Sequence, residues 1–184
     1  LSGDDAGKFA KSVTGKVCTV TWASAQDYEA AANDDDGDGT YELSIAFTDG
    51  TNPLGAQSTS ITLADANDIT PTYAATNANP TVTEGTTAVE SVTITDADTD
   101  AVDDNACTLG GDDAALFTCT VTETAYTLAF TNAPDYDSGT ACAAGNTCAV
   151  TVTISDGTNT GDAVTYSIDI GDANDQTPAV TVAE

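Results

Sequence analysis

The chain has 184 residues, and its 30 acidic against 3 basic residues give a formal net charge of −27. Nucleic acid and anionic membrane surfaces carry the same sign of charge, so both are poor partners. The chain has no His, which excludes His-based catalytic triads and imidazole metal sites, and no apolar run long enough to insert in a membrane.

Apolar and polar residues alternate along several segments, as in Val150-Thr151-Val152-Thr153-Ile154. A period of two is typical of half-buried strands, and no stretch has a sustained helical period. Short strands separated by turn pairs such as Asp49-Gly50 and Asp156-Gly157 indicate an all-β antiparallel sandwich. Strands are predicted near residues 17–23, 40–48, 57–64, 86–95, 116–121, 125–131, 147–155 and 163–171.

The chain contains an internal repeat. Leu1–Phe9 matches Leu109–Phe117, and Asp65–Asp68 matches Asp172–Asp175 in the same order. The first copy has no counterpart of the opening part of the second, so it is expected to be cut from a tandem array or completed by strands of neighbouring copies. The predicted organisation is a partial repeat over 1–71, a complete repeat over 72–178 and the first strand of a following repeat over 179–184.

Two copies of Asp-Ala-Asn-Asp-x-x-Pro, at Asp65–Pro71 and Asp172–Pro178, each follow a predicted strand. Each crowds carboxylate and amide oxygens at a domain boundary, which is the ligand chemistry of a hard cation such as Ca²⁺. The alternative is a solvated acidic surface of the halophile type, which predicts scattered acids rather than acids at matched repeat positions.

The five cysteines form no CxxC motif. Turn-rich spacers separate Cys107 from Cys119 and Cys142 from Cys148, which predicts two local disulfides and an oxidising compartment. Reduced, buried thiols are the alternative. Cys18 is left over, either free and buried or paired outside this chain.

A further acidic cluster, Asp34, Asp36 and Asp38, matches the start of a D-x-D-x-D-G calcium loop, but the twelfth position is Ile45 rather than Glu. This cluster is predicted to be either a solvated hairpin loop or an accessory calcium site. The pairs Asp4-Asp5 and Asp112-Asp113 are expected to be turn residues.

Taken together, Asp27-Tyr28-Glu29, the Tyr41–Gly50 segment, the Asp-Ala-Asn-Asp-x-x-Pro copies and Asp96-Ala97-Asp98 resemble a cadherin repeat of the bacterial type. The resemblance implies tandem seven-stranded Greek-key sandwiches, the first incomplete at its N-terminus, with Ca²⁺ in each linker. It also implies an extracellular, cell-surface location and partners that are neighbouring repeats or copies of the chain.

Carried over residue by residue, the resemblance implies two calcium sites. The linker site comprises Asp27, Glu29, Asp65, Asn67, Asp68, Asp96, Asp98 and Asp156. A half site comprises Glu84, Asp135, Asp137, Asp172, Asn174 and Asp175, and Asp49 is expected to serve a linker before Leu1. Asp137 departs from the family pattern, which has Glu there.

The predicted function is that of a calcium-rigidified structural or adhesive repeat segment of a surface adhesin or filament, with copies joining head to tail. The alternative is a calcium-dependent carbohydrate-binding module with a glycan ligand. Trp22 is the only Trp and no aromatic platform is apparent, which favours the adhesive function. Because the sequence has no pocket signature for a carboxylate-pair hydrolase, the protein is not expected to be an enzyme.

Overall fold

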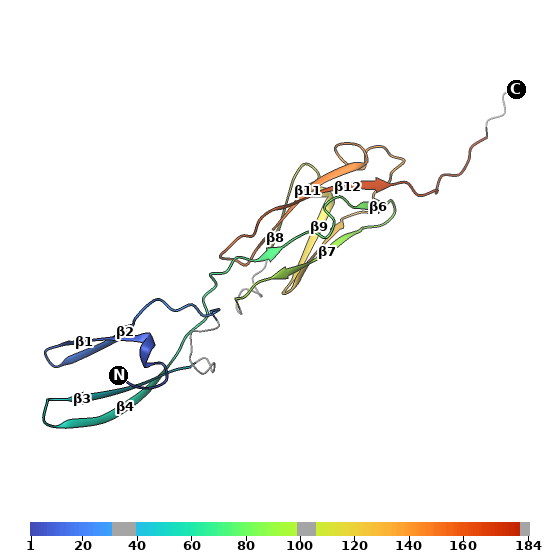
Figure 1. Cartoon of the computed structure of the whole chain (residues 1–184). Helices are drawn as coiled ribbons and strands as arrows, with labels where there is room; N and C mark the ends of the chain where they lie inside the picture. Colours follow the sequence, from blue (N-terminus) through green and yellow to red (C-terminus); the bar gives the residue numbers. More distant parts are fainter. Residues whose placement is uncertain (31–39, 99–105, 181–184) are drawn as a thin grey trace. The chain divides into compact units, whose positions relative to one another are not determined.

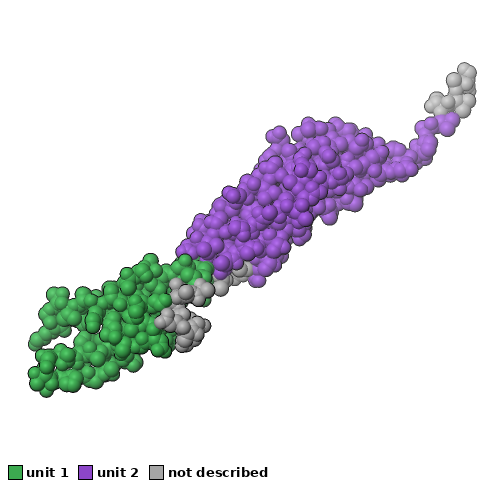
Figure 2. Space-filling view, in the orientation of Figure 1, with its two compact units in different colours: residues 1–66 green, residues 67–184 purple. Residues whose placement is uncertain are grey.

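The computed structural model describes residues 1–30, 40–98 and 106–180. The chain forms two compact units, unit 1 (Leu1–Ala66) and unit 2 (Asn67–Glu184), coloured separately in Figure 2. Both are built from strands, with two three-residue 3₁₀ turns, η1 (Ala6–Lys8) and η2 (Ala114–Leu116), so the predicted all-β fold class is confirmed. In the described ranges no helix is long and apolar enough to cross a membrane.

Unit 2 is a sandwich of two four-stranded sheets, ordered β5-β7-β10-β9 and β6-β12-β11-β8 (Figure 1). Its strands are β5 (Thr72–Tyr73), β6 (Thr81–Thr83), β7 (Ala88–Thr95), β8 (Ala106–Gly110), β9 (Phe117–Thr122), β10 (Ala125–Phe130), β11 (Thr147–Ser155) and β12 (Val164–Gly171). The first edge strand is divided between the sheets, because β5 pairs with β7 whereas β6 pairs in parallel with β12. The remaining pairs are antiparallel.

The core of unit 2 follows from the period-two pattern, because alternate side chains of a strand point to one face. On β11, Val150, Val152 and Ile154 are fully buried, and on the paired strand β12, Tyr166 is buried opposite Val150, with Ile168 and Ile170 buried further along. These residues belong to a cluster of fifteen buried apolar side chains among the described residues. The sandwich therefore holds its loops on a rigid base.

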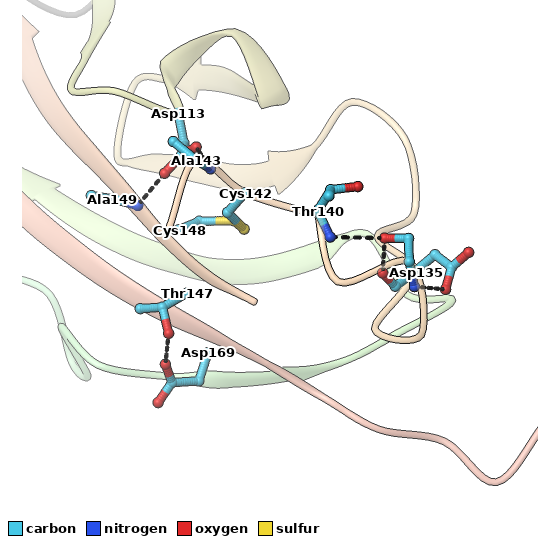
Figure 3. The surroundings of a disulfide bond; sticks show 10 residues. Asp113, Asp135, Thr140, Cys142, Ala143, Thr147, Cys148, Ala149 and Asp169 are labelled. Carbon is cyan, nitrogen blue, oxygen red and sulfur yellow. Dashed lines mark hydrogen bonds between the residues drawn. A yellow bond between two sulfur atoms is a disulfide. The ribbon is translucent and has the colours of Figure 1, made fainter. Parts of the chain in front are cut away.

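Two disulfides tie unit 2 together, as the cysteine spacing predicts. Cys107–Cys119 joins β8 to β9, the last strands of the two sheets, with a Cα–Cα distance of 6.1 Å. Cys142–Cys148 closes the loop that precedes β11 (Figure 3), with a Cα–Cα distance of 5.0 Å. Cys18, in unit 1, is a free cysteine and is half-buried.

Unit 1 consists of two hairpins rather than a closed sandwich. β1 (Phe9–Thr14) pairs with β2 (Val17–Trp22), and β3 (Thr40–Thr48) pairs with β4 (Pro53–Thr62). Its described core contains three buried side chains, Phe9, Tyr41 and Leu43, with half-buried apolar residues around them. Every residue of β4 is exposed, so this unit buries far less apolar surface than unit 2.

The predicted strands lie close to observed ones, but four strands were missed: β1, β5, β6 and β8. β4 begins at Pro53, where the sequence indicates a turn; a proline is tolerated at the first residue of a strand. The units divide between Ala66 and Asn67, five residues before the predicted boundary at residue 71, because residues after Ala66 bond to unit 2.

Candidate metal centres

One end of unit 2 gathers carboxylates from two loops that lie far apart in the sequence. Asp96 and Asp98 follow β7, and Asp156 follows β11. Asp98 is 2% exposed and Asp156 is fully buried. Burying ionised carboxylates is costly unless hydrogen bonds or a cation compensate. The hydrogen-bond partners of each carboxylate oxygen therefore indicate whether this end of unit 2 is suited to bind a cation.

In each of these three carboxylates, one oxygen is satisfied and the other is not. The Ile69 amide donates to Asp98 Oδ2 at 2.8 Å, and the Asp98 amide donates to Asp96 Oδ1 at 3.2 Å. Asp156 Oδ1 accepts the amides of Thr158 and Asn159. The second oxygens, Asp96 Oδ2, Asp98 Oδ1 and Asp156 Oδ2, are buried without a hydrogen-bond partner.

The unsatisfied oxygens also repel one another. Burial raises the pKa of Asp96 above its ordinary value, and the charges of Asp98 and Asp156 raise it further. A bound cation removes both costs, because each unpartnered oxygen can coordinate it and because its positive charge neutralises the carboxylates. The donor set of oxygens fits Ca²⁺, and we name this group (Asp96, Asp98 and Asp156) the proximal site.

The segment after Ala66 closes over the proximal site through amide contacts. Asn67 Nδ2 donates to the Asp156 carbonyl at 3.3 Å. Asn159 Nδ2 is shared between Asn67 Oδ1 at 3.2 Å and the Ile69 carbonyl at 3.1 Å. Asn67 therefore lies at this end of unit 2, and Asp68, although exposed, has a carboxylate oxygen within 4.8 Å of one of Asp98.

Asn159 is a structural residue of the proximal site that the sequence analysis did not single out. It ends Asp156-Gly157-Thr158-Asn159, which matches Asp49-Gly50-Thr51-Asn52 in unit 1. In both copies the aspartate accepts the amides of the third and fourth residues. The repetition of this Asp-x-x-Asn turn is the sequence signal that would have found it.

The opposite end of unit 2 is organised by Glu84, which directly follows β6. Its side chain is 6% exposed. Oε2 accepts the Tyr136 amide and Oε1 accepts the Ala173 amide, each at 2.7 Å. These two bonds lower the pKa of Glu84 and hold the loop before Asp137 and the segment after β12 against the end of β6.

Glu84 also belongs to the second acidic group, which we name the distal site. One carboxylate oxygen each from Glu84, Asp137 and Asp175 lies within 4.8 Å of the others. Burial raises the pKa of Asp172, with further contributions from Asp137, Glu84 and Asp175. Asp135 instead accepts the Ser138 amide at 3.1 Å, and Asn174 is exposed. The structure thus brings together four of the six predicted residues of the half site.

Unit 1 contains its own acidic group, formed by Asp27, Glu29 and Asp65. The pKa of Glu29 is raised to about 7, first by burial and then by hydrogen bonding to Asp65 and Asp27 and the charge of Asp65. The predicted ligands that lie within unit 1 are therefore neighbours.

The remaining predicted ligands are placed as follows. Asp49 lies in the turn between β3 and β4, and the Thr51 and Asn52 amides lower its pKa. Asp34, Asp36 and Asp38 lie outside the described residues.

No protein-family model matches this chain, and no curated protein matches it. Solved structures do match. A protocadherin gammaB7 EC3-6 cis-dimer structure is 19% identical with a TM-score of 0.67, over 96% of this chain and 40% of that one. Human protocadherin-24 EC1-2, Form II, is 20% identical with a TM-score of 0.62, over 93% of this chain and 80% of that one. Mouse protocadherin-24 EC1-3 is 18% identical with a TM-score of 0.65, over 92% of this chain and 53% of that one. At these identities the likeness concerns the fold, and the chain has a cadherin-like β-sandwich fold.

Proposed function

We propose that this chain is a calcium-stabilised, extracellular repeat segment with a structural and adhesive role, of the bacterial cadherin type. The observation that carries the proposal is the set of three buried, partnerless carboxylate oxygens on Asp96, Asp98 and Asp156. An acidic chain with 3 basic residues has few internal cations for such oxygens. A metal ion compensates their burial, and Ca²⁺ prefers carboxylate, amide and carbonyl oxygens in a flexible arrangement.

Three groups would ligate calcium under this proposal. They are the proximal site with the amide side chain of Asn67, the distal site with Asp172, and the unit 1 group of Asp27, Glu29 and Asp65. When bound, the ion supplies positive charge where like charges now meet. The protein's contribution is to hold the carboxylates in place through backbone amides, as Ile69 and Thr158 do.

The extracellular assignment rests on two further observations. Two disulfides in a small β-sandwich are typical of oxidising compartments. The structural neighbours include extracellular domains of protocadherins. We propose that the segment belongs to a surface adhesin or filament, whose partners are neighbouring repeats or further copies of the chain.

Thermal unfolding of the full chain during a calcium titration tests the proposal. A ligand at one hundred times its Kd stabilises by about 2.7 kcal/mol per site, which raises the Tm of a domain of this size by roughly 10–20 °C. EDTA should reverse the rise, and Mg²⁺ should produce little of it because it demands tighter octahedral geometry. An unchanged Tm at millimolar calcium would refute the calcium claim.

A further inference from the structure

At the distal site, Asp137 is presented by the loop between β10 and β11. Tyr136 directly precedes it, and both backbone groups of Tyr136 are hydrogen-bonded. The Tyr136 amide donates to Glu84 Oε2 at 2.7 Å. The Tyr136 carbonyl accepts Asn146 Nδ2 at 3.0 Å and the Gly139 amide at 3.1 Å. The position of Asp137 is therefore set by the partners of its neighbour.

Of these partners, Asn146 is the one that links the loop to another strand without being an acid of the site. Glu84 belongs to the acidic group itself, so its oxygens face both the amides and any bound cation. Asn146 directly precedes β11, and its carbonyl accepts the Ile170 amide of β12 at 2.8 Å. It thus joins the loop to β12, the strand that leads to Asp172.

The other atom of the Asn146 amide indicates that this residue does more for position than for stability. In the described part of the chain, Asn146 Oδ1 is buried without a hydrogen-bond partner. Burying an unpaired polar atom is unfavourable, and this cost offsets the gain from the bond that Nδ2 makes. Asn146 therefore fixes the Tyr136 carbonyl while adding little to the stability of unit 2.

The loop that carries Asn146 is closed twice. Cys142 and Cys148 bracket Asn146 with a disulfide (Figure 3). Asp113 accepts the amides of the residues that directly follow the two cysteines, each at 2.7 Å. The loop end is therefore a fixed support, from which the Asn146 side chain reaches Tyr136.

We propose that Asn146 is a positioning residue of the distal site, which holds the Tyr136 carbonyl and so places Asp137 for a bound Ca²⁺. The Cys142–Cys148 loop holds Asn146 in turn. Hydrogen bonds around the ligands of a metal set their orientation and tune its affinity. This inference rests on the proposed function, because it takes the distal site to bind Ca²⁺, and it deepens that function by assigning the residue that controls this site.

The proximal site offers a matched residue for the test. There Asn159 Nδ2 donates to the Ile69 carbonyl at 3.1 Å, as Asn146 Nδ2 does to the Tyr136 carbonyl. Each site thus has one asparagine whose amide holds a backbone carbonyl. If both act by positioning, replacing one asparagine affects its own site and spares the other.

A calcium titration of the full chain followed by NMR reads the two sites separately. The Ala173 amide, bonded to Glu84, reports on the distal site, and the Ile69 amide, bonded to Asp98, reports on the proximal site. The calcium midpoint of each resonance is measured in the unchanged chain and in each variant. The spectrum in EDTA shows whether a variant is folded before calcium is added.

We expect Asn146→Ala to raise the midpoint read at Ala173 about tenfold, the lower end of the loss that follows removal of a hydrogen bond supporting a metal ligand. The midpoint read at Ile69 should stay unchanged, and so should the Tm in EDTA. Asn159→Ala should show the reverse pattern, with a higher midpoint at Ile69 and an unchanged one at Ala173.

An isosteric substitution separates position from charge. Asn146→Asp keeps the shape of the side chain but removes the donor for the Tyr136 carbonyl and adds a negative charge. The charge alone would attract Ca²⁺ and lower the midpoint at Ala173, whereas lost positioning raises it; we expect a rise. The control Asn132→Asp adds the same charge at an exposed position of the same loop and should not raise the midpoint.

The two disulfides provide a second matched pair. Replacing Cys142 and Cys148 by Ser should raise the midpoint at Ala173, because the support of Asn146 is loosened. Replacing Cys107 and Cys119 by Ser removes a disulfide elsewhere in unit 2 and should leave that midpoint unchanged. Equal effects of the two double variants contradict the role of the loop.

The outcomes distinguish this inference from the proposed function. An unchanged midpoint at Ala173 in Asn146→Ala, or equal shifts at Ala173 and Ile69, overturns the inference and leaves calcium binding intact. If only Ile69 responds to calcium in the unchanged chain, the distal site does not bind the ion and the inference fails alone. If neither resonance responds, the proposed function fails as well.

Discussion

At the scale of single residues, aspartates at matching positions of the repeat share a structural role. Asp113 lies in a turn, as predicted, but it is only 4% exposed. Its Oδ1 accepts the Ala143 amide and its Oδ2 the Ala149 amide, both at 2.7 Å (Figure 3). Asp5, at the matching position of unit 1, is 1% exposed and accepts the Glu42 amide. These aspartates have a structural role, as hydrogen-bond acceptors for backbone amides, rather than a role as metal ligands.

We expect Asp113→Ala to destabilise unit 2 by about 2–4 kcal/mol, because it leaves two amides without their charged acceptor. Urea unfolding followed by circular dichroism measures the loss. Asp112→Ala is the control, since Asp112 is the exposed neighbour and its removal should change the free energy of unfolding by less than about 0.5 kcal/mol. Similar losses in both variants would contradict the assignment.

Substitution of Asp98 tests the proximal site at the scale of a single residue. The Asp98→Asn side chain can still accept the Ile69 amide, but it removes the negative charge from a buried position. We expect the calcium concentration that half-stabilises the protein to rise at least tenfold, while the Tm in EDTA stays the same or rises because repulsion is relieved. Asp162→Asn, which removes an exposed charge, should leave the calcium midpoint unchanged; an equal shift would count against the site.

At the scale of elements, the nine-residue strands were predictable and the strands of two and three residues were not. β3 and β11 each have nine residues, and both coincide with the predicted ranges 40–48 and 147–155. β5 and β6 have two and three residues, too few for a period of two to stand out. β8 was missed because Leu109-Gly110-Gly111 indicates a turn, which in the structure starts directly after the strand.

The backbone conformation of Gly111, in the turn after β8, explains why a glycine is present at this position. Its φ is +93°, and an added Cβ would lie 2.9 Å from the Ala149 carbonyl oxygen. Gly3 of unit 1 has a φ of +115° and a similar contact with the Glu42 carbonyl oxygen. The spacing that both copies of the repeat share therefore brings the turn after β8 close to the neighbouring strand, and places Asp113 for its two bonds.

The Cys107–Cys119 bond provides an element-scale prediction. It connects β8 and β9 across a separation of 12 residues, so the double Cys→Ser variant should lose about 3 kcal/mol through the entropy of the unfolded chain. Its fold should persist, because both strands keep their ladder partners. Chemical denaturation quantifies the loss, and Cys18→Ser, the free cysteine, is the control expected to show little change. An unfolded double variant would mean that the bond is required to assemble the sheets.

At the scale of the whole molecule, acidic groups make stability depend on pH in opposite directions. Glu29, Asp96 and Asp172 have raised pKa values, whereas Glu84 and Asp49 have lowered ones. A raised folded-state pKa contributes stability that is complete at low pH and is lost as the pH rises through that pKa. For Glu29 the loss extends from its ordinary value of 4.5 to about 7. The groups whose pKa values are lowered change the stability only below about pH 4.5, where they begin to take up protons.

In EDTA we therefore expect the Tm to rise when the pH is lowered from 8 to about 5.5. In saturating calcium the rise should disappear, because the cation keeps the carboxylates ionised in the folded state. Thermal scans across this pH range measure both slopes. The Glu29→Gln variant should have a shallower slope in EDTA; an unchanged slope would show that another group dominates.

The sequence by itself determined the all-β class, the repeat, the disulfide pairs and the positions of the acidic motifs, because each depends on local alternation or spacing. The tertiary structure decided the rest. Asp98 and Asp156 each bury one oxygen without a hydrogen-bond partner, whereas each carboxylate oxygen of Glu84 accepts one backbone amide. Only contacts between segments that are distant in the sequence determine this difference. The same holds for unit 1, where Phe9, Tyr41 and Leu43 are buried while every residue of β4 is exposed. Burial arises from packing between segments that are distant in the sequence. The residue pattern along one strand therefore does not specify which segment packs against that strand.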